Sequence, residues 1–131
     1  IFGEGSFKHK LKQYLDKLGI KYELKPPQPY KEYINYLSRA NLFGLLSEKE
    51  AFGQAVNEAN AIGVPVVVAK PWGVNFSGRC KTLVVNLEKD DYVIAGEIRD
   101  LMKRCTKESR SKVPVWSEVV EAYVKYLYSG Q

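Results

Sequence analysis

Residues 42–69 of the chain read LFGLLSEKEAFGQAVNEANAIGVPVVVA, with an alanine-rich segment between two apolar ones. Residues 42–46 are mainly apolar and predict a buried strand. Residues 51–62 have the composition of a helix, and Gly63 is placed to end it. Residues 65–69 are β-branched and apolar on both faces, as a strand covered by helices on each side should be. The stretch therefore predicts a strand, a helix and a second strand in succession.

The remainder of the chain alternates helices and strands in the same way, with short connections. Helices are expected at residues 7–18, 30–37, 91–104 and 114–128, and further strands at residues 1–2, 20–24 and 82–86. Asp90 is the expected N-cap of the helix at 91–104. The pattern predicts an α/β fold, a Rossmann-like doubly wound parallel sheet with helices on both faces.

Ligands of such sheets bind beyond the carboxyl ends of the strands. Function is therefore sought in the loops expected at that edge. These are residues 3–6, 25–29, 47–52, 70–79 and 86–90. In the fourth loop, we expect Trp72 to pack against its own domain rather than to stack on a ligand.

Composition excludes several classes of protein. The chain has 131 residues, the size of one domain, and no apolar run approaches the length that crosses a bilayer. Its two cysteines, Cys80 and Cys105, lack the spacing of metal ligands, which predicts a reducing, cytoplasmic setting. His9 has no cysteine or second histidine nearby, and we expect no metal site.

The net charge of +5 leaves three interpretations open. A basic domain can bind nucleic acid. However, Lys8, Lys10 and Lys12 are interleaved with apolar residues at helical spacing, which favours a solvated helix face. The third interpretation is an anionic ligand, such as a nucleotide diphosphate.

The segment that follows the strand at 42–46 contains the candidate chemistry. Glu50 lies in the loop, Phe52 and Gly53 stand at the helix start, and Glu58 lies inside the helix. Free N–H groups near Phe52, Gly53 and Gln54 would bind an anion or a hydroxyl group, and Gly53 would let a ligand approach the backbone. Two carboxylates nearby would accept hydrogen bonds from vicinal hydroxyls, so a sugar nucleotide fits. The alternative is that both glutamates are ordinary solvated residues.

Glu50 and Glu58 are separated by seven residues, and their surroundings form a specific signature: Phe52-Gly53, Glu58-Ala59, Gly63, Pro65-Val66-Val67, Phe2-Gly3-Glu4-Gly5 upstream and Trp116 downstream. With these residues the chain resembles, over nearly its whole length, the carboxyl-terminal domain of retaining glycosyltransferases with the two-domain B-type fold. That group contains glycogen synthase and many mannosyl- and glucosyltransferases. The chain departs from the family at Ala51, at Pro26-Pro27 and around Gly73, and these departures leave the donor open.

The resemblance implies retaining transfer of a hexosyl group from a UDP-, ADP- or GDP-sugar. We expect this transfer to take place in the cytoplasm or at a membrane face, without a cofactor or metal. Glu50 would contact the transferred sugar as the catalytic residue, and Glu58 would hold the ribose hydroxyls. The backbone at Phe52, Gly53 and Gln54 would line the sugar and phosphates. The remaining donor-binding residues would be Gly3, Gly5 and Lys25, with the turn at 25–29 beside the base.

We expect residues 1–131 to be a single nucleotide-sugar-binding domain and a fragment of a two-domain enzyme, inactive alone. The family's first strand and an acceptor-binding N-terminal domain would precede Ile1. Without that first strand, residues 1–2 and 42–46 are expected to pair directly in a five-stranded sheet; a strand from another chain is the alternative. The competing functions are a non-catalytic sugar-nucleotide module, a basic nucleic-acid-binding domain, and an epimerase or phosphorylase of the same architecture.

Overall fold

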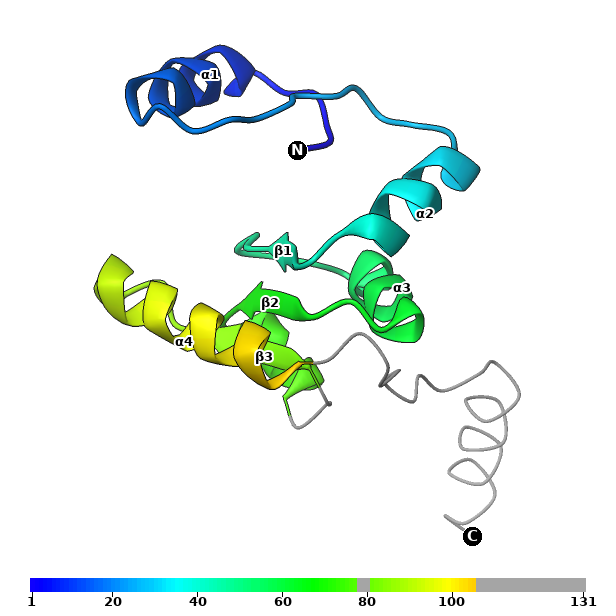
Figure 1. The fold of residues 1–131 in the computed structure, drawn as a ribbon, viewed down its shortest axis with the longest axis vertical. Coiled ribbons are helices and arrows are strands. Elements are labelled where there is room, and N and C mark those ends of the chain that lie inside the picture. Colours follow the sequence, from blue (N-terminus) through cyan, green and yellow to red (C-terminus); the bar gives the residue numbers. More distant parts are fainter. Residues whose placement is uncertain (78–80, 106–131) are drawn as a thin grey trace, which may run out of the picture. The chain divides into compact units, whose positions relative to one another are not determined.

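The computed structural model describes residues 1–77 and 81–105 (Figure 1). They belong to two compact units, of which the first is Ile1–Tyr36 and the second begins at Leu37. The elements are α1 (Lys8–Lys17), α2 (Tyr30–Arg39), β1 (Phe43–Leu45), α3 (Gln54–Ile62), β2 (Val66–Ala69), the 3₁₀-helix η1 (Trp72–Phe76), β3 (Thr82–Val85) and α4 (Asp91–Arg104).

The second unit is built on a parallel sheet with the strand order β1-β2-β3. The register places Val67 beside Gly44 on one side and beside Leu83 on the other. All four residues of the central strand β2 are buried, as their continuous apolar character predicts.

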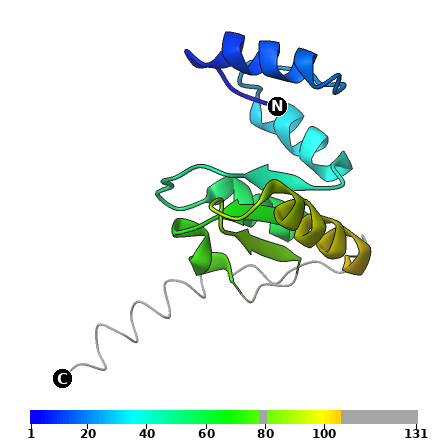
Figure 2. The same cartoon turned by 90° about the vertical axis from the view of Figure 1, so that its left-hand side faces the viewer.

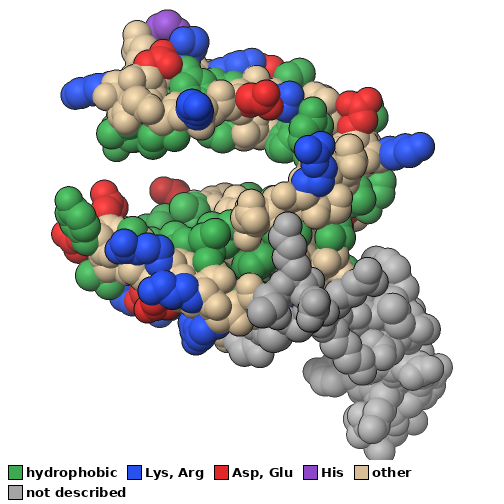
Figure 3. Space-filling view, in the orientation of Figure 1, with side chains coloured by type: hydrophobic (Ala, Val, Ile, Leu, Met, Phe, Trp, Pro, Cys, Tyr) green, Lys and Arg blue, Asp and Glu red, His purple; other side chains and the backbone are tan. Residues whose placement is uncertain are grey.

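Helices cover both faces of this sheet, with α3 and α4 on opposite sides (Figures 1 and 2). On the α4 side, Val67 and Val85 form a core with Leu101. On the other side, the hydroxyl of Thr82 donates a hydrogen bond of 3.2 Å to Oδ1 of Asn60 in α3. Charged side chains lie on the outer side of α4 (Figure 3). Glu97 of this helix forms an ion pair with Lys89, which precedes the helix. The predicted α/β, Rossmann-like fold with helices on both faces is confirmed.

Two glycines set the limits of α3. Gly53 precedes the helix at φ 65°, and Gly63 follows it at φ 91°, both in the left-handed region that favours glycine. At the C-terminus the N–H of Val64 donates to the carbonyl of Ala59 at 2.9 Å, the pattern of a Schellman cap. The predicted helix began at residue 51, three residues too early, because the left-handed Gly53 cannot continue a right-handed helix.

The loop expected at 70–79 contains η1, which packs against β2. A Cβ atom added to Gly73 would lie 2.7 Å from Cγ2 of Val68, so only glycine lets η1 approach the strand this closely. Phe76 is buried at the end of η1. Residues 72–76 of this loop are therefore anchored to the sheet.

In the first unit, residues 1–3 pair with residue 25 through a parallel bridge. The N–H of Lys25 donates to the carbonyl of Ile1 at 2.8 Å, and the N–H of Gly3 donates to the carbonyl of Lys25 at 2.9 Å. This makes a single bridge between Phe2 and Lys25. The strand predicted at 20–24 is wrong, since in the described chain only residue 25 reaches this bridge.

The direct pairing of residues 1–2 with 42–46 in a five-stranded sheet is also wrong. The described sheet has three strands, and Phe2 pairs instead with Lys25. Pairing with residue 25 closes a shorter loop than pairing with residues 42–46 would, and a shorter loop costs less entropy to close. The helix predicted at 114–128, with Trp116, lies outside the described residues, as does Cys80. Among the described helices, none has both the length and the apolar character needed to cross a membrane.

Candidate functional site

The candidate site lies at the carboxyl ends of β1 and β2, where residues 46–53 and 70–77 follow the two strands. Trp72 connects these segments. Its indole Nε1–H donates to the backbone carbonyl of Ser47 at 2.5 Å, and its ring meets Phe76 edge-on at 5.7 Å between centroids. The expectation that Trp72 packs against its own domain is confirmed.

Gly53 lies against these two aromatic rings. A Cβ atom at this position would be 2.7 Å from Cζ of Phe76 and 3.3 Å from Cζ3 of Trp72. We expected Gly53 to leave room for a ligand. The rings fill that space, so the structural need for glycine here arises from packing and from its positive φ.

The N-terminus of α3 points its free N–H groups toward this edge of the sheet. The carbonyl of Gly53 accepts hydrogen bonds from Val56 and Asn57, which leaves the first helical amides, Gln54 and Ala55, as the unpaired donors of an α-helix. Gly53 offers no side-chain cap to this terminus. The helix dipole makes such a terminus favourable for phosphate or for a polarised hydroxyl group.

A cavity of about 200 Å³ opens between this terminus and η1. It combines one carboxylate (Glu50), two side-chain amides (Asn57 and Asn75) and aromatic rings, of which Phe52 is 68% exposed. Carboxylates and amides bind hydroxyl groups, and aromatic rings provide an apolar surface beside them. The cavity lining thus has the mixed chemistry that a sugar ring requires. Its lining residues are Glu50, Ala51, Phe52, Asn57, Trp72, Asn75 and Phe76.

The structure brings Glu50 and Phe52 together at this cavity and places Glu58 elsewhere on α3. Glu50 is exposed, and the hydroxyl of Ser47 donates to its Oε2 at 3.4 Å. Glu58 is half-buried, and its Oε1 accepts a hydrogen bond of 3.5 Å from the side-chain amide of Gln54. Glu58, Gly53 and Gln54 do not line the cavity.

Three expected donor-binding residues belong to the first unit. Gly3 and Gly5 are exposed, and Gly3 has φ 133°. Lys25 makes an ion pair of 3.1 Å with Glu23, and its Nζ lies 5.1 Å from the ring centre of Tyr36. The hydrogen bond to Glu23, followed by the one to Tyr36, raises the pKa of Lys25. The side chain therefore stays an ammonium group at neutral pH.

Sequence reasoning missed Asn57 and Asn75 as members of the cavity. Asn75 lies in a loop already expected at the carboxyl edge, so its position was a usable signal. Asn57 is one residue before Glu58 on α3, and a helical projection would have placed the two on different sides of the helix.

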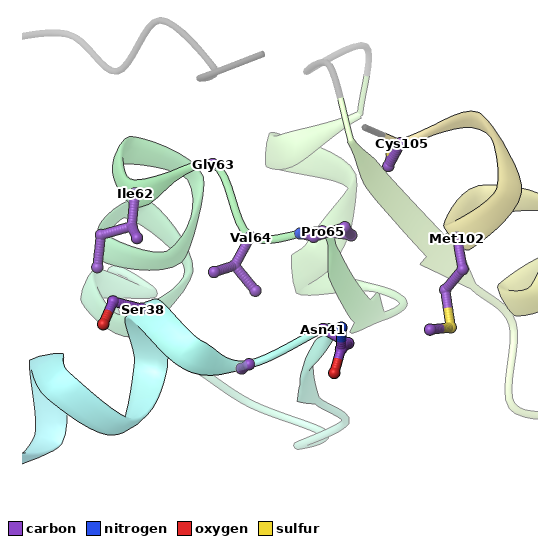
Figure 4. Close-up of a pocket in the computed structure, with 9 residues that line it drawn as sticks. Ser38, Asn41, Ile62, Gly63, Val64, Pro65, Met102 and Cys105 are labelled. Atoms are coloured by element: carbon purple, nitrogen blue, oxygen red, sulfur yellow. The ribbon is translucent and has the colours of Figure 1, made fainter. Parts of the chain in front are cut away.

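A second cavity, of about 190 Å³, lies at the opposite edge of the sheet (Figure 4). Asn41 and Pro65 reach it from the amino ends of β1 and β2, and Met102 and Cys105 from the end of α4. None of the described residues that line it is an Asp, Glu, Lys or Arg. Among the described residues, it therefore lacks the carboxylate that Glu50 offers to sugar hydroxyls in the first cavity.

Metal-binding groups do not gather in the part of the chain that the structure describes. No cluster of three or more His, Cys, Asp or Glu side chains occurs among residues 1–77 and 81–105. The ring of His9 instead lies 3.1 Å from the side-chain amide of Gln13, on the exposed α1.

The comparisons with known proteins identify a family for the chain. The family model of glycosyl transferases group 1 matches residues 1–77. The matched segment contains β1, α3, β2 and η1, together with every candidate site residue. A search of curated proteins finds no match to the chain. The family model covers more than half of the 131 residues, and the chain belongs to the group 1 glycosyltransferases.

Proposed function

We propose that this chain binds a nucleotide-diphosphate sugar and provides the donor site for retaining hexosyl transfer to an acceptor, as part of a longer enzyme. The observation that carries the proposal is the position of Glu50. Its carboxylate lines a cavity of polar and aromatic side chains beside the N-terminus of α3, inside the segment that matches the family.

The proposed roles follow from the chemistry of these groups. The free amides of α3 stabilise the negative charge that develops on the diphosphate as its bond to the sugar breaks. Glu50 accepts hydrogen bonds from hydroxyls of the transferred sugar, and Phe52 supplies an apolar surface. Glu58 accepts from the ribose hydroxyls. Donor-binding roles for Gly3, Gly5 and Lys25 remain predictions from the family resemblance.

The lysines of α1 argue against nucleic-acid binding as the main function. Lys8 pairs with Glu4 and Lys12 with Asp16, each at 2.8 Å, so part of the positive charge is compensated locally. Phosphate-binding surfaces need cations that are available to the backbone of the nucleic acid.

Calorimetric titration of the chain tests the proposal. The ligands are UDP, ADP and GDP, the matching UDP-glucose, ADP-glucose and GDP-mannose, and a single-stranded oligonucleotide as the control. We expect one base to be selected, with its sugar nucleotide binding more tightly than the bare diphosphate. Binding of the oligonucleotide alone, or of none of the six nucleotides, would contradict it.

A further inference from the structure

We propose that Trp72 is a positioning residue that holds Glu50 ready for the donor sugar. The inference rests on the proposed function and extends it to a cavity-lining residue that was not among the predicted donor-binding residues. Trp72 acts through the segment at 47–53, which connects β1 to α3 and contains Glu50.

One end of this segment is held through Ser47. The backbone carbonyl of Ser47 accepts the hydrogen bond of 2.5 Å from Nε1 of Trp72, while its hydroxyl donates to Oε2 of Glu50 at 3.4 Å. A single residue therefore connects the indole to the carboxylate. Ser47 is half-buried and Glu50 is exposed, so the connection leads from a half-buried residue to a carboxylate that faces solvent.

The other end of the segment is held at Gly53. The indole and the ring of Phe76 lie against the α-carbon of Gly53, too close for any side chain there. Trp72 thus contacts both the beginning and the end of the segment. Glu50 and Phe52 lie between these two points.

Trp72 itself is fixed by the sheet. It is the first residue of η1, and Gly73 next to it packs against Val68 of β2, a fully buried residue. Phe76 at the end of η1 is 5% exposed. The packing of η1 on β2 therefore fixes Trp72, and Trp72 in turn holds the segment that contains Glu50.

This arrangement reduces the freedom that Glu50 loses on binding. An exposed carboxylate on an unsupported loop samples several rotamers and loses that entropy when it binds a ligand. Holding Ser47 orders the loop before binding. Glu50, the proposed contact of the sugar, lies in the segment that Trp72 holds, whereas Glu58, the proposed contact of the ribose, lies on α3. Loss of the Trp72 hydrogen bond should therefore weaken the contribution of the sugar to affinity and leave that of the nucleotide unchanged.

The test compares Trp72→Phe with the wild type, using calorimetry with the three diphosphates and their sugar nucleotides. Phenylalanine retains an aromatic ring and removes the N–H donor. We expect the affinity for the sugar nucleotide to fall by about fivefold, the usual effect of one lost hydrogen bond, and the affinity for the diphosphate to stay the same. Glu50→Gln should reduce the same sugar contribution. Val74→Ala, on the exposed side of η1, is the matched control and should change neither affinity.

The outcomes separate this inference from the proposed function. If the wild type binds no sugar nucleotide better than its diphosphate, the proposed function fails. If the wild type shows that preference and Glu50→Gln loses it, but Trp72→Phe keeps it, the positioning role is overturned. An equal loss for diphosphate and sugar nucleotide would indicate a merely structural role and also overturns it. Should Trp72→Phe fail to fold, Ser47→Ala decides, since loss of the sugar preference supports the connection and an unchanged preference contradicts it.

Discussion

At the scale of single residues, the two glutamates of the signature occupy different environments. Glu50 lines the cavity from an exposed loop, and Glu58 is half-buried on α3 beside Gln54. A charge-assisted hydrogen bond to a more buried carboxylate contributes more than one to an exposed carboxylate. Glu58 is therefore the residue whose loss should weaken nucleotide binding most.

Replacing Glu58 by alanine tests this role. We expect the binding free energy of the selected nucleotide diphosphate to weaken by about 1–3 kcal/mol, because a charge-assisted acceptor for the ribose hydroxyls is removed. Calorimetry measures the change. Glu48→Ala is the control, since Glu48 is exposed and stands outside the signature. Equal affinities for Glu58→Ala and the wild type would identify Glu58 as an ordinary solvated residue.

Two glycines give opposite predictions for stability. Gly53→Ala should lower the free energy of unfolding by about 1–3 kcal/mol for the left-handed backbone alone, and by more because its Cβ would meet Phe76 at 2.7 Å. Gly96 is inside α4, and nothing lies within 4 Å of a Cβ added there. Gly96→Ala should therefore raise stability by about 1 kcal/mol. Urea denaturation measures both; a stable Gly53→Ala variant would contradict the described geometry.

At the scale of elements, those with a strong local signal were predictable. β2 is apolar on both faces, and α4 begins after Asp90, whose side chain accepts from the N–H of Tyr92 at 2.8 Å as an N-cap should. Residues 20–24 have the composition of a strand, but in the described chain they have no partner strand. A single bridge forms just after them, at residue 25. Pairing is a property of two segments, so composition could not decide it.

Contacts between residues far apart in the chain were also outside the reach of sequence reasoning. Lys81, just before β3 at the edge opposite the candidate site, is 5% exposed and donates to the carbonyl of Gly63 at 2.9 Å, beyond the C-terminus of α3. Trp72 similarly reaches Ser47, 25 residues earlier. The residues next to a lysine or a tryptophan in a loop do not indicate which distant residue its side chain will contact. The signature around Glu50 predicted the candidate site, and the packing around it became visible only in three dimensions.

The helix α1 gives a prediction for pH dependence. Hydrogen bonds from Lys12 and then from Tyr22 lower the pKa of Asp16. A carboxyl group whose pKa is depressed in the folded state adds stability above its ordinary pKa and loses it as the pH falls through the folded value. By NMR titration, we expect the pKa of Asp16 to rise toward its usual range in Lys12→Met and to rise less in Tyr22→Phe. An unchanged Asp16 titration in Lys12→Met would rule out this ion pair in solution.

At the scale of the whole molecule, the parallel sheet determines where the site can be. The carboxyl ends of β1 and β2 and the N-terminus of α3 meet at one edge, and the family match includes all three elements. The opposite edge has a cavity of similar size, and none of the described residues that line it is an Asp, Glu, Lys or Arg. Cavity size alone therefore does not favour one edge, whereas strand direction and the position of Glu50 favour the carboxyl edge.

The central claim is that a sugar nucleotide binds at the N-terminus of α3, and backbone amide NMR tests it most directly. UDP-glucose, ADP-glucose and GDP-mannose are titrated in turn into ¹⁵N-labelled chain. With the ligand that binds, we predict the largest shift changes at the amides of Gly53, Gln54 and Ala55 and at Glu50, with little change at Met102 and Cys105 in the other cavity. Shift changes confined to Met102 and Cys105 or to the lysines of α1, with Gly53–Ala55 unaffected, would contradict the account.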